Sequence, residues 1–340
     1  MRVSVITTVR NEETSIAGLL DSLLAQTRPP DDVVLADGGS TDRTREIAAG
    51  YVGRGLPLCI LDAPGSNISQ GRNLAIRAAT GDVIASVDGG VRLDPRWLAE
   101  LTAPLEHPSP NNVDVVSGFF QADAQTAFEA AMGATVLPNL ADVEPASFLP
   151  SSRSVAFTRA AWERVGGYPQ WLDYCEDVVF DLRLRAAGCR FAWAPGALAH
   201  FRPRSSLRAF FLQYYHYARG DGKADLWRKR HAARYATYLA ALPGLAALTV
   251  LQSPLWLLVL IAGALAYTLR PYQRLLPHLG RYSWPQRLEA LALVPIIRVT
   301  GDVAKMLGYP AGLWWRWQRR SDPRLHWRRV HAPPAPPGES

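Results

Sequence analysis

Short apolar runs alternate with segments of helical apolar spacing over roughly the first 90 residues of the chain. The run RVSVITTV at 2–9 is rich in β-branched residues, which is typical of a buried parallel strand. Similar runs at 32–36, 56–61 and 82–88 predict three further strands. Because strands and helices alternate, the pattern predicts an α/β fold with an open, mostly parallel sheet and short right-handed crossovers.

Two of these predicted strands end on an aspartate that precedes a pair of glycines. Asp37 precedes Gly38-Gly39, and Asp88 precedes Gly89-Gly90. Ligands of open parallel sheets bind at the carboxyl ends of the strands. The sequence therefore predicts a ligand site at this edge, although Asp37 would equally serve to cap the helix that follows.

Four other polar residues are predicted near the same edge. Asn11 and Glu12 follow the first strand, where Asn11 is as consistent with a helix N-cap as with a ligand contact. Arg72 and Asn73 lie near the start of the third predicted helix, where they would offer a guanidinium and an amide to a diphosphate. A solvent-exposed surface arginine is the alternative interpretation of Arg72.

Four segments resemble, in the family's order, the signatures of family 2 glycosyltransferases with a GT-A fold. They are TTVRNEETSIAGLLDSL, LADGGSTDRT, GRNLAIRAATGDVIASVD and FTRAAWERVGGYPQWLDYCEDVVFDLRLRAAG. Each motif alone is weakly specific, but together they cover about residues 2–200. The resemblance implies an inverting, hexosyltransferase-like transfer from a nucleotide diphosphate-sugar, of the kind used to make envelope polysaccharides or glycolipids.

The resemblance also implies roles for individual residues. Asp37 matches the position that contacts the base or ribose of the donor. Inverting transfer needs a base that takes the proton of the acceptor hydroxyl, and Asp177 matches that base, with Glu176 as its neighbour. Carboxylates at a helix start also favour the helix dipole, so a structural role for both remains open.

A divalent metal, Mn²⁺ or Mg²⁺, is expected from the resemblance, with Asp88 as one ligand. The usual second carboxylate is missing, because Gly90 stands in its place. Asp94 reads instead as a helix N-cap, since Pro95 follows it. In metal-dependent relatives a histidine at the position of His200 completes the site; a core or cleft histidine is the alternative.

One further arginine is a candidate for donor binding. Arg219, in QYYHYARGDGK, resembles the basic element that some membrane-bound members place over the donor diphosphate. The family's Gln-x-x-Arg-Trp pattern is absent, so an arginine at a membrane surface is the alternative.

Composition and charge divide the chain into two unlike parts. The 340 residues are 48% hydrophobic, which excludes disordered and fibrous classes. Residues 1–200 contain 16 Lys and Arg against 24 Asp and Glu, a net charge of −8, whereas 201–340 contain 21 against 6, a net charge of +15. Three cysteines without CxxC spacing indicate neither a disulfide framework nor a zinc site.

The basic part contains a long uncharged segment at 235–269, which favours a membrane partner over nucleic acid. A single straight helix would be roughly 50 Å long, well beyond a hydrocarbon core of about 30 Å. The break Gln252-Ser253-Pro254 favours a hairpin that returns the basic tail to the cytosolic side, with a kinked single span as the alternative. The shorter run at 288–297 predicts an interfacial amphipathic helix.

The chain begins directly with a strand-like run, without a signal-peptide pattern, so the first domain is expected on the cytosolic face of the membrane. A lipid-linked acceptor is suggested by the membrane segment. Two other functions remain open: a catalytically silent protein that binds nucleotide-sugars or lipid phosphates, and a nucleotidyltransferase, which is disfavoured because no lysine precedes residue 201.

The predicted organisation is a GT-A domain at 1–205, with a donor half at about 1–120 and an acceptor half at 121–205, interface helices at 206–234, the hairpin at 235–269, basic interfacial helices at 270–330 and a disordered tail at 331–340.

Overall fold

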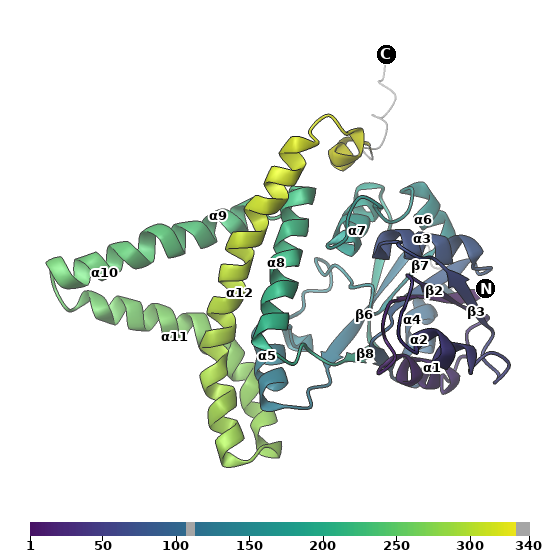
Figure 1. Ribbon diagram of the computed structural model, residues 1–340, viewed down its shortest axis with the longest axis horizontal. Helices are drawn as coiled ribbons and strands as arrows, with labels where there is room; N and C mark the ends of the chain where they lie inside the picture. Colours follow the sequence, from purple (N-terminus) through teal and green to yellow (C-terminus); the bar gives the residue numbers. More distant parts are fainter. Residues whose placement is uncertain (107–112, 331–340) are drawn as a thin grey trace. The chain divides into compact units, whose positions relative to one another are not determined.

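The computed structural model describes residues 1–106 and 113–330 and divides into two compact units (Figure 1). Among the described residues, the sheet unit comprises 1–106, 113–121, 140–201 and 322–330, and the helical unit comprises 122–139 and 202–321. The predicted single domain at 1–205 is thus interrupted, because 122–139 packs with the later helices. The predicted disordered tail lies outside the described residues.

An eight-stranded mixed sheet forms the centre of the sheet unit, with the strand order β3-β2-β1-β4-β7-β6-β8-β5. The first four strands in this order are parallel, and the pairs β4–β7, β7–β6 and β8–β5 are antiparallel. The α/β prediction is therefore confirmed, with an antiparallel half beside the predicted parallel half. The strands are β1 Val3–Val9, β2 Asp32–Asp37, β3 Leu58–Asp62, β4 Val83–Asp88, β5 Val91–Leu93, β6 Val115–Ala122, β7 Val155–Thr158 and β8 Phe191–Phe201.

Helices connect and flank these strands. The Asn67 side chain caps α3 in a reciprocal capping box with Gln70, which fixes where that helix begins. The helices of the sheet unit are α1 Ile16–Leu24, α2 Thr44–Ala49, α3 Ile68–Ala78, α4 Trp97–Glu106, α6 Arg159–Arg164, α7 Glu176–Ala186 and α13 Trp327–Val330, with short 3₁₀ turns at Leu140–Asp142 and Pro323–His326.

The register of the central strands brings the two strand-end aspartates to one edge. β1 lies between β2 and β4, and Thr8 aligns with Asp88 while Val9 aligns with Asp37. Both carboxylates therefore end strands that neighbour β1 at the same level of the sheet, as expected for a ligand site at the carboxyl ends of parallel strands.

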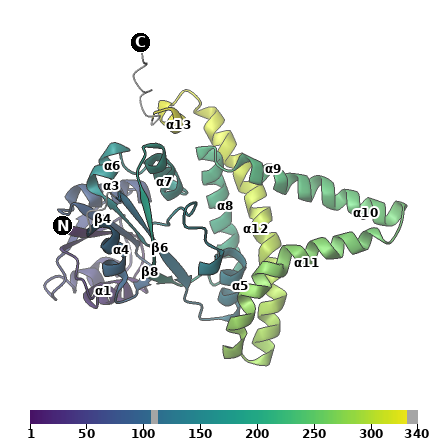
Figure 2. The same cartoon turned by 180° about the vertical axis from the view of Figure 1, so that it is seen from behind.

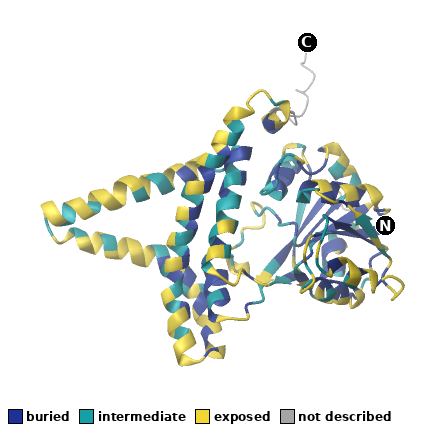
Figure 3. Ribbon diagram, in the orientation of Figure 1, coloured by how far each residue is buried: buried dark blue, intermediate teal, exposed yellow. Residues whose placement is uncertain are grey.

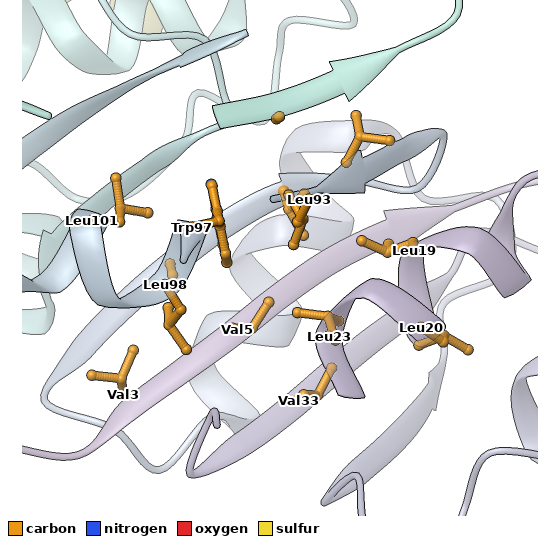
Figure 4. Close-up of a cluster of buried hydrophobic side chains, with 14 of the residues drawn as sticks. Val3, Val5, Leu19, Leu20, Leu23, Val33, Leu93, Trp97, Leu98 and Leu101 are labelled. Carbon is orange, nitrogen blue, oxygen red and sulfur yellow. The ribbon is translucent and has the colours of Figure 1, made fainter. Parts of the chain in front are cut away.

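Both faces of the parallel half are buried. Val5 packs in one apolar cluster with Leu19 and Trp97 (Figure 4), whereas the next residue, Ile6, packs in a second cluster with Phe157. Successive side chains of a strand point to opposite faces, so β1 contributes to both clusters. This explains why β1 contains no charged residue and does not alternate between apolar and charged positions.

The helical unit contains α5 Ala127–Val136, α8 Leu207–Ala224, α9 Arg228–Ala236, a π-helical segment at Thr237–Ala241, α10 Leu242–Leu251, α11 Trp256–Leu275, a 3₁₀ segment at Leu276–Arg281 and α12 Trp284–Gln318. The chain turns between α10 and α11 at the predicted break, and Figure 2 shows these two helices meeting at the turn and diverging from it. The run at 288–297, expected to be a short helix, lies inside the 35-residue α12.

Helices α8 and α12 approach closely at glycines. A Cβ placed on Gly308 would lie 2.2 Å from the Tyr215 carbonyl oxygen, and one on Gly312 would lie 2.1 Å from the Arg219 carbonyl oxygen. Any larger residue at these two positions would force the helix backbones apart, so the pair specifies this packing.

Within the described residues, one continuous helical segment, Arg228–Leu251, has the length and composition to cross a membrane, and none of its apolar window is buried. Figure 3 shows that α10 and α11 are exposed over most of their length. Leu251 is 82% exposed and Leu258 is 61% exposed.

Trp97 is predicted to be a main contributor to the stability of the sheet unit. Its side chain is fully buried, and its indole nitrogen donates to Ser154 Oγ at 2.8 Å. Trp97→Ala should lower the free energy of unfolding by about 3–5 kcal/mol, because it leaves a large cavity and removes the hydrogen bond to Ser154 Oγ. Chemical denaturation measures this change. Trp284→Ala, at a position 69% exposed, is the control and should change stability by less than about 0.5 kcal/mol; equal losses in both variants would contradict the prediction.

Candidate functional site

Asp37 and Asn11 both accept hydrogen bonds from the loop that follows β2, at the carboxyl edge of the sheet. Asp37 is 4% exposed, and its Oδ1 accepts from both the Ser40 backbone nitrogen (2.9 Å) and Ser40 Oγ (2.7 Å). Asn11 Oδ1 accepts from the Thr41 backbone nitrogen at 2.9 Å. Asn11 is therefore no helix N-cap, since α1 begins only at Ile16; its contact with the donor, like that of Asp37, stays a prediction.

A buried arginine links the two halves of the sheet unit. Arg72, on α3, is 2% exposed; its Nη2 donates to Asp88 Oδ1 at 2.8 Å and its Nη1 donates to Glu176 Oε1 at 2.6 Å. Burial lowers the pKa of Arg72, but the two carboxylates raise it by more, so the guanidinium is held charged. The alternative of a surface arginine is excluded.

Two further groups complete the surroundings of this arginine. The guanidinium carbon of Arg72 lies 5.2 Å from the ring centroid of Tyr168, a cation–π distance. Arg153 Nε lies 3.6 Å from Asp88 Oδ2, so Asp88 has a cation beside each oxygen. Sequence analysis missed both residues. Their only local indications are an arginine in the SSRS loop before β7 and an aromatic residue after a glycine pair.

Asn73 has a structural role in this arrangement. Its Nδ2 donates to the Tyr168 carbonyl at 2.8 Å, and its Oδ1 accepts from the Tyr168 backbone nitrogen (2.9 Å) and from the Trp162 indole nitrogen (3.1 Å). The amide thus holds the loop that carries Tyr168 against α3. These bonds occupy the side chain that was expected to contact the donor.

Helix α7 begins with the two acidic residues expected to face the acceptor. Cys175, just before it, has a φ of 62°, a left-handed conformation that is rare for residues other than glycine. Glu176 is 6% exposed, and burial, together with the neighbouring Asp177, raises its pKa to about 7 against the opposing effect of Arg72. Asp177 is only half-buried, so it is the more accessible of the two carboxylates.

Asp181 lies one turn further along α7 and was not anticipated. It is 2% exposed, and its Oδ2 has no hydrogen-bond partner among the described residues. Burial raises the pKa of this carboxyl well above its usual value, with a further contribution from Asp177 and opposition from Arg185. A protonated carboxyl is the form that such surroundings favour.

The turn after Asp88 brings Glu12 to the same place. A Cβ on Gly89 would lie 2.8 Å from Val9 Cγ1, so packing excludes a side chain there. A Cβ on Gly90 would meet nothing closer than Glu12 Oε2, at 3.5 Å. The carboxylate of Glu12 therefore lies beside the position where the family motif carries its second acidic residue.

His200 lies beside the carboxylate of Asp94 and not beside that of Asp88. Its Nε2 lies 3.4 Å from Asp94 Oδ1, and its strand neighbour is Arg92, whereas the contacts of Asp88 are to Arg72 and Arg153. In the part of the chain that the structure describes, no group of three or more His, Cys, Asp or Glu side chains could hold a metal ion. Protein side chains alone thus do not form a complete metal site there.

Arg219 is part of the helical unit. It lies on α8, at the level where α8 meets Gly312 of α12. Its predicted contact with the donor diphosphate stays a prediction.

Comparisons with known proteins agree with this geometry. The family model "Glycosyl transferase family 2" matches residues 4–150. Over these residues the chain is similar to glycosyltransferase family 2. It is 33% identical over 120 residues to the uncharacterized glycosyltransferase EpsJ of Bacillus subtilis, a match that covers 35% of this chain and 34% of EpsJ. It is 28% identical over 230 residues to the succinoglycan biosynthesis protein ExoA of Rhizobium meliloti, covering 63% of this chain and 67% of ExoA.

Solved structures give the same fold. The mannosyltransferase PcManGT from Pyrobaculum calidifontis, solved with GDP-Man and Mn²⁺, matches with a TM-score of 0.60 at 21% identity, covering 90% of this chain and 87% of that chain. The similarity confirms the GT-A type of fold predicted from the sequence. The chain spans about a third of the length of EpsJ.

Asp181 makes the stability of this protein depend on pH. Because the pKa of its carboxyl is raised in the folded protein, its contribution to stability is full below the unfolded pKa of about 3.9 and is lost as pH rises through the folded pKa. Asp181→Asn should remove this loss, so the gain in melting temperature over the wild type should grow from pH 5 to pH 8. Thermal unfolding at both pH values measures it, and a gain that is the same at both would contradict the assignment.

Proposed function

We propose that the protein is an inverting glycosyltransferase that moves a sugar from a nucleotide diphosphate-sugar to an acceptor hydroxyl at a membrane surface. The observation that carries this proposal is the bridge from Asp88 through Arg72 to Glu176. It ties the nucleotide-side edge of the parallel strands to the start of α7, where the acceptor is expected. A family 2 chain with both halves of this site intact is suited to transfer and not only to binding.

In the proposed reaction, the acceptor hydroxyl attacks the anomeric carbon and transfers its proton to Asp177. The bond between that carbon and the diphosphate oxygen breaks, and the nucleoside diphosphate leaves with the electron pair. Asp177 suits the role of base because it is half-buried at the start of a helix. Glu176 is bonded to Arg72 and positions that helix start.

The donor's diphosphate needs cations. Arg153 is the cationic group beside Asp88 that is not fully buried, with 21% of its side chain exposed. PcManGT was solved in complex with GDP-Man and Mn²⁺, and we propose that a divalent cation binds with the donor in this chain as well. A divalent ion here would rely on phosphate oxygens, as Mg²⁺ in particular does, with Asp88 as a protein ligand. His200 remains a candidate second ligand, and an imidazole would favour Mn²⁺.

Membrane association is proposed from the helical unit. Large apolar side chains are exposed on both legs of its hairpin, among them Val250 at 83%, Leu255 at 70% and Leu265 at 65%. An apolar surface of this extent requires a nonpolar partner. Arg234 and Arg270 bracket the uncharged segment. Arg234 is paired with Asp302, whereas Arg270 is exposed and would lie near anionic headgroups, which favours a cytosolic catalytic face and a lipid-linked acceptor.

Asp177→Asn tests the assignment of the base. The variant should bind nucleoside diphosphate as the wild type does, because the amide keeps the shape of the side chain. Turnover of the donor should fall by about 100-fold or more, the usual scale for a positioned acid–base group. The first step is to find an accepted donor by thermal-shift screening of nucleotide-sugars, followed by measurement of nucleoside diphosphate release with membrane lipid extract.

Asp82→Asn is the matched control, since Asp82 lies just before β4, at the opposite end of that strand from Asp88. Its turnover should equal that of the wild type. Near-normal turnover in Asp177→Asn would refute the assignment of Asp177 as the base. Wild-type protein that binds donors but never releases nucleoside diphosphate would favour the silent binding protein.

The hairpin is tested by cysteine labelling. Ser321, exposed after α12, should lie on the cytosolic side if the two legs return the chain to the side it left. In intact cells Ser321→Cys should resist a membrane-impermeant thiol reagent and react after permeabilisation. Wild-type protein, with its three native cysteines, reports the background. Labelling of the variant alone in intact cells would instead support a single crossing.

A further inference from the structure

The two glycines after Asp88 differ in how much space a side chain would have at their positions. Gly89 is enclosed, since a Cβ there would lie 2.8 Å from Val9 Cγ1 and 3.3 Å from the Thr8 carbonyl oxygen. Gly90 is not enclosed, because its nearest neighbour would be Glu12 Oε2 at 3.5 Å, an ordinary van der Waals distance. Packing therefore does not require a glycine at position 90. The space that a side chain would occupy there is bordered by the carboxylate of Glu12, from another loop.

The backbone of Glu12 is fixed independently of its carboxylate. Its nitrogen donates to Thr44 Oγ1 at 2.7 Å, and its carbonyl accepts from the Ile16 backbone nitrogen at 2.8 Å. Asn11, the residue before it, has a φ of 57°, so the chain turns sharply at this point. Left-handed conformations of non-glycine residues are maintained only where surrounding contacts determine them. Here they direct the Glu12 side chain toward Gly90.

We propose that Glu12 supplies the second carboxylate that the sequence lacks at Gly90. With Asp88 it would hold a divalent cation that is completed by the oxygens of the donor diphosphate. This inference rests on the proposed function, because the cation is needed only when a nucleotide diphosphate-sugar binds. It differs from the ligand pair expected from the sequence, in which His200 takes the second place.

The chemistry of the two carboxylates fits this role. Asp88 Oδ1 accepts from Arg72, while its Oδ2 is held only by an ion pair with Arg153, whose Nε lies 3.6 Å away, beyond hydrogen-bonding distance. The Glu12 side chain is half-buried and accepts from Ser15 Oγ. Two carboxylates and substrate phosphates are a ligand set that Mg²⁺ and Mn²⁺ both accept.

Glu12→Gln tests the proposal in the full-length protein. Binding of Mn²⁺ is followed by electron paramagnetic resonance, alone and with UDP or GDP. The wild type should bind Mn²⁺ weakly alone and more tightly with one of the nucleotides. Glu12→Gln should weaken the nucleotide-dependent binding by about tenfold or more, because a neutral amide replaces one of two anionic ligands. Glu13→Gln, one residue away and exposed, is the matched control and should bind as the wild type does.

A second substitution tests the position directly. Gly90→Asp in the Glu12→Gln background should restore most of the lost Mn²⁺ affinity, because it places a carboxylate in the space that Glu12 borders. Nucleotide binding in excess chelator should be equal in the wild type and Glu12→Gln. If chelator-independent binding falls instead, Glu12 contacts the nucleotide and the proposal is wrong.

Two other results would separate this proposal from the proposed function. Unchanged Mn²⁺ affinity in Glu12→Gln would refute the role of Glu12, while donor turnover by the wild type would leave glycosyl transfer intact. Donor turnover that persists in excess chelator would overturn the cation site itself and assign the neutralisation of the diphosphate to Arg153. Failure of the wild type to turn over any donor would count against the proposed function, and not against Mn²⁺ binding by Glu12.

Discussion

The site depends on the burial of one guanidinium. Arg72 has almost no contact with solvent, and a charge in such a position is stable only when opposite charges and hydrogen bonds surround it. Asp88 and Glu176, the two carboxylates that meet this need, come from segments 16 and 104 residues away along the chain. Satisfying Arg72 therefore requires β4 and α7 to be in place together.

The same arrangement sets the acid–base properties of α7. Glu176 is drawn into the protein by its bond to Arg72, and burial then raises its pKa. Asp181, one turn later, is buried without such a cation bonded to it, and the pKa of its carboxyl is also raised. Asp177 lies between them in sequence but is more exposed. One helix start thus carries carboxyl groups in unlike surroundings, which suits a division between a base and its supporting groups.

The helical unit combines closely packed helices with helices whose apolar side chains are exposed. Its helices α8 and α12 are held close by glycines, where backbone approaches backbone, while α10 and α11 leave large apolar side chains exposed. Small residues at a helix crossing and apolar side chains directed outward are both typical of helices that meet lipid. The asymmetry of charge along the sequence follows the same division, since the basic excess falls after residue 200.

Much of the fold was determined by the sequence alone. Runs of β-branched residues specify the parallel strands, because a strand buried on both faces does not alternate between apolar and charged positions, and the strand ends at Asp37 and Asp88 follow from those runs. The uncharged segment and its break at Gln252–Pro254 are equally local properties. What only the tertiary structure decided is which side chains meet. Arg72 bonds to carboxylates on other elements, and Asn73 bonds to the loop that carries Tyr168. The burial of Asp181 and the position of Glu12 beside Gly90 likewise depend on neighbours from elsewhere in the chain. Local periodicity reports the face of an element and not the neighbour it meets, so a carboxylate missing from one loop and offered by another is visible only once the chain has folded.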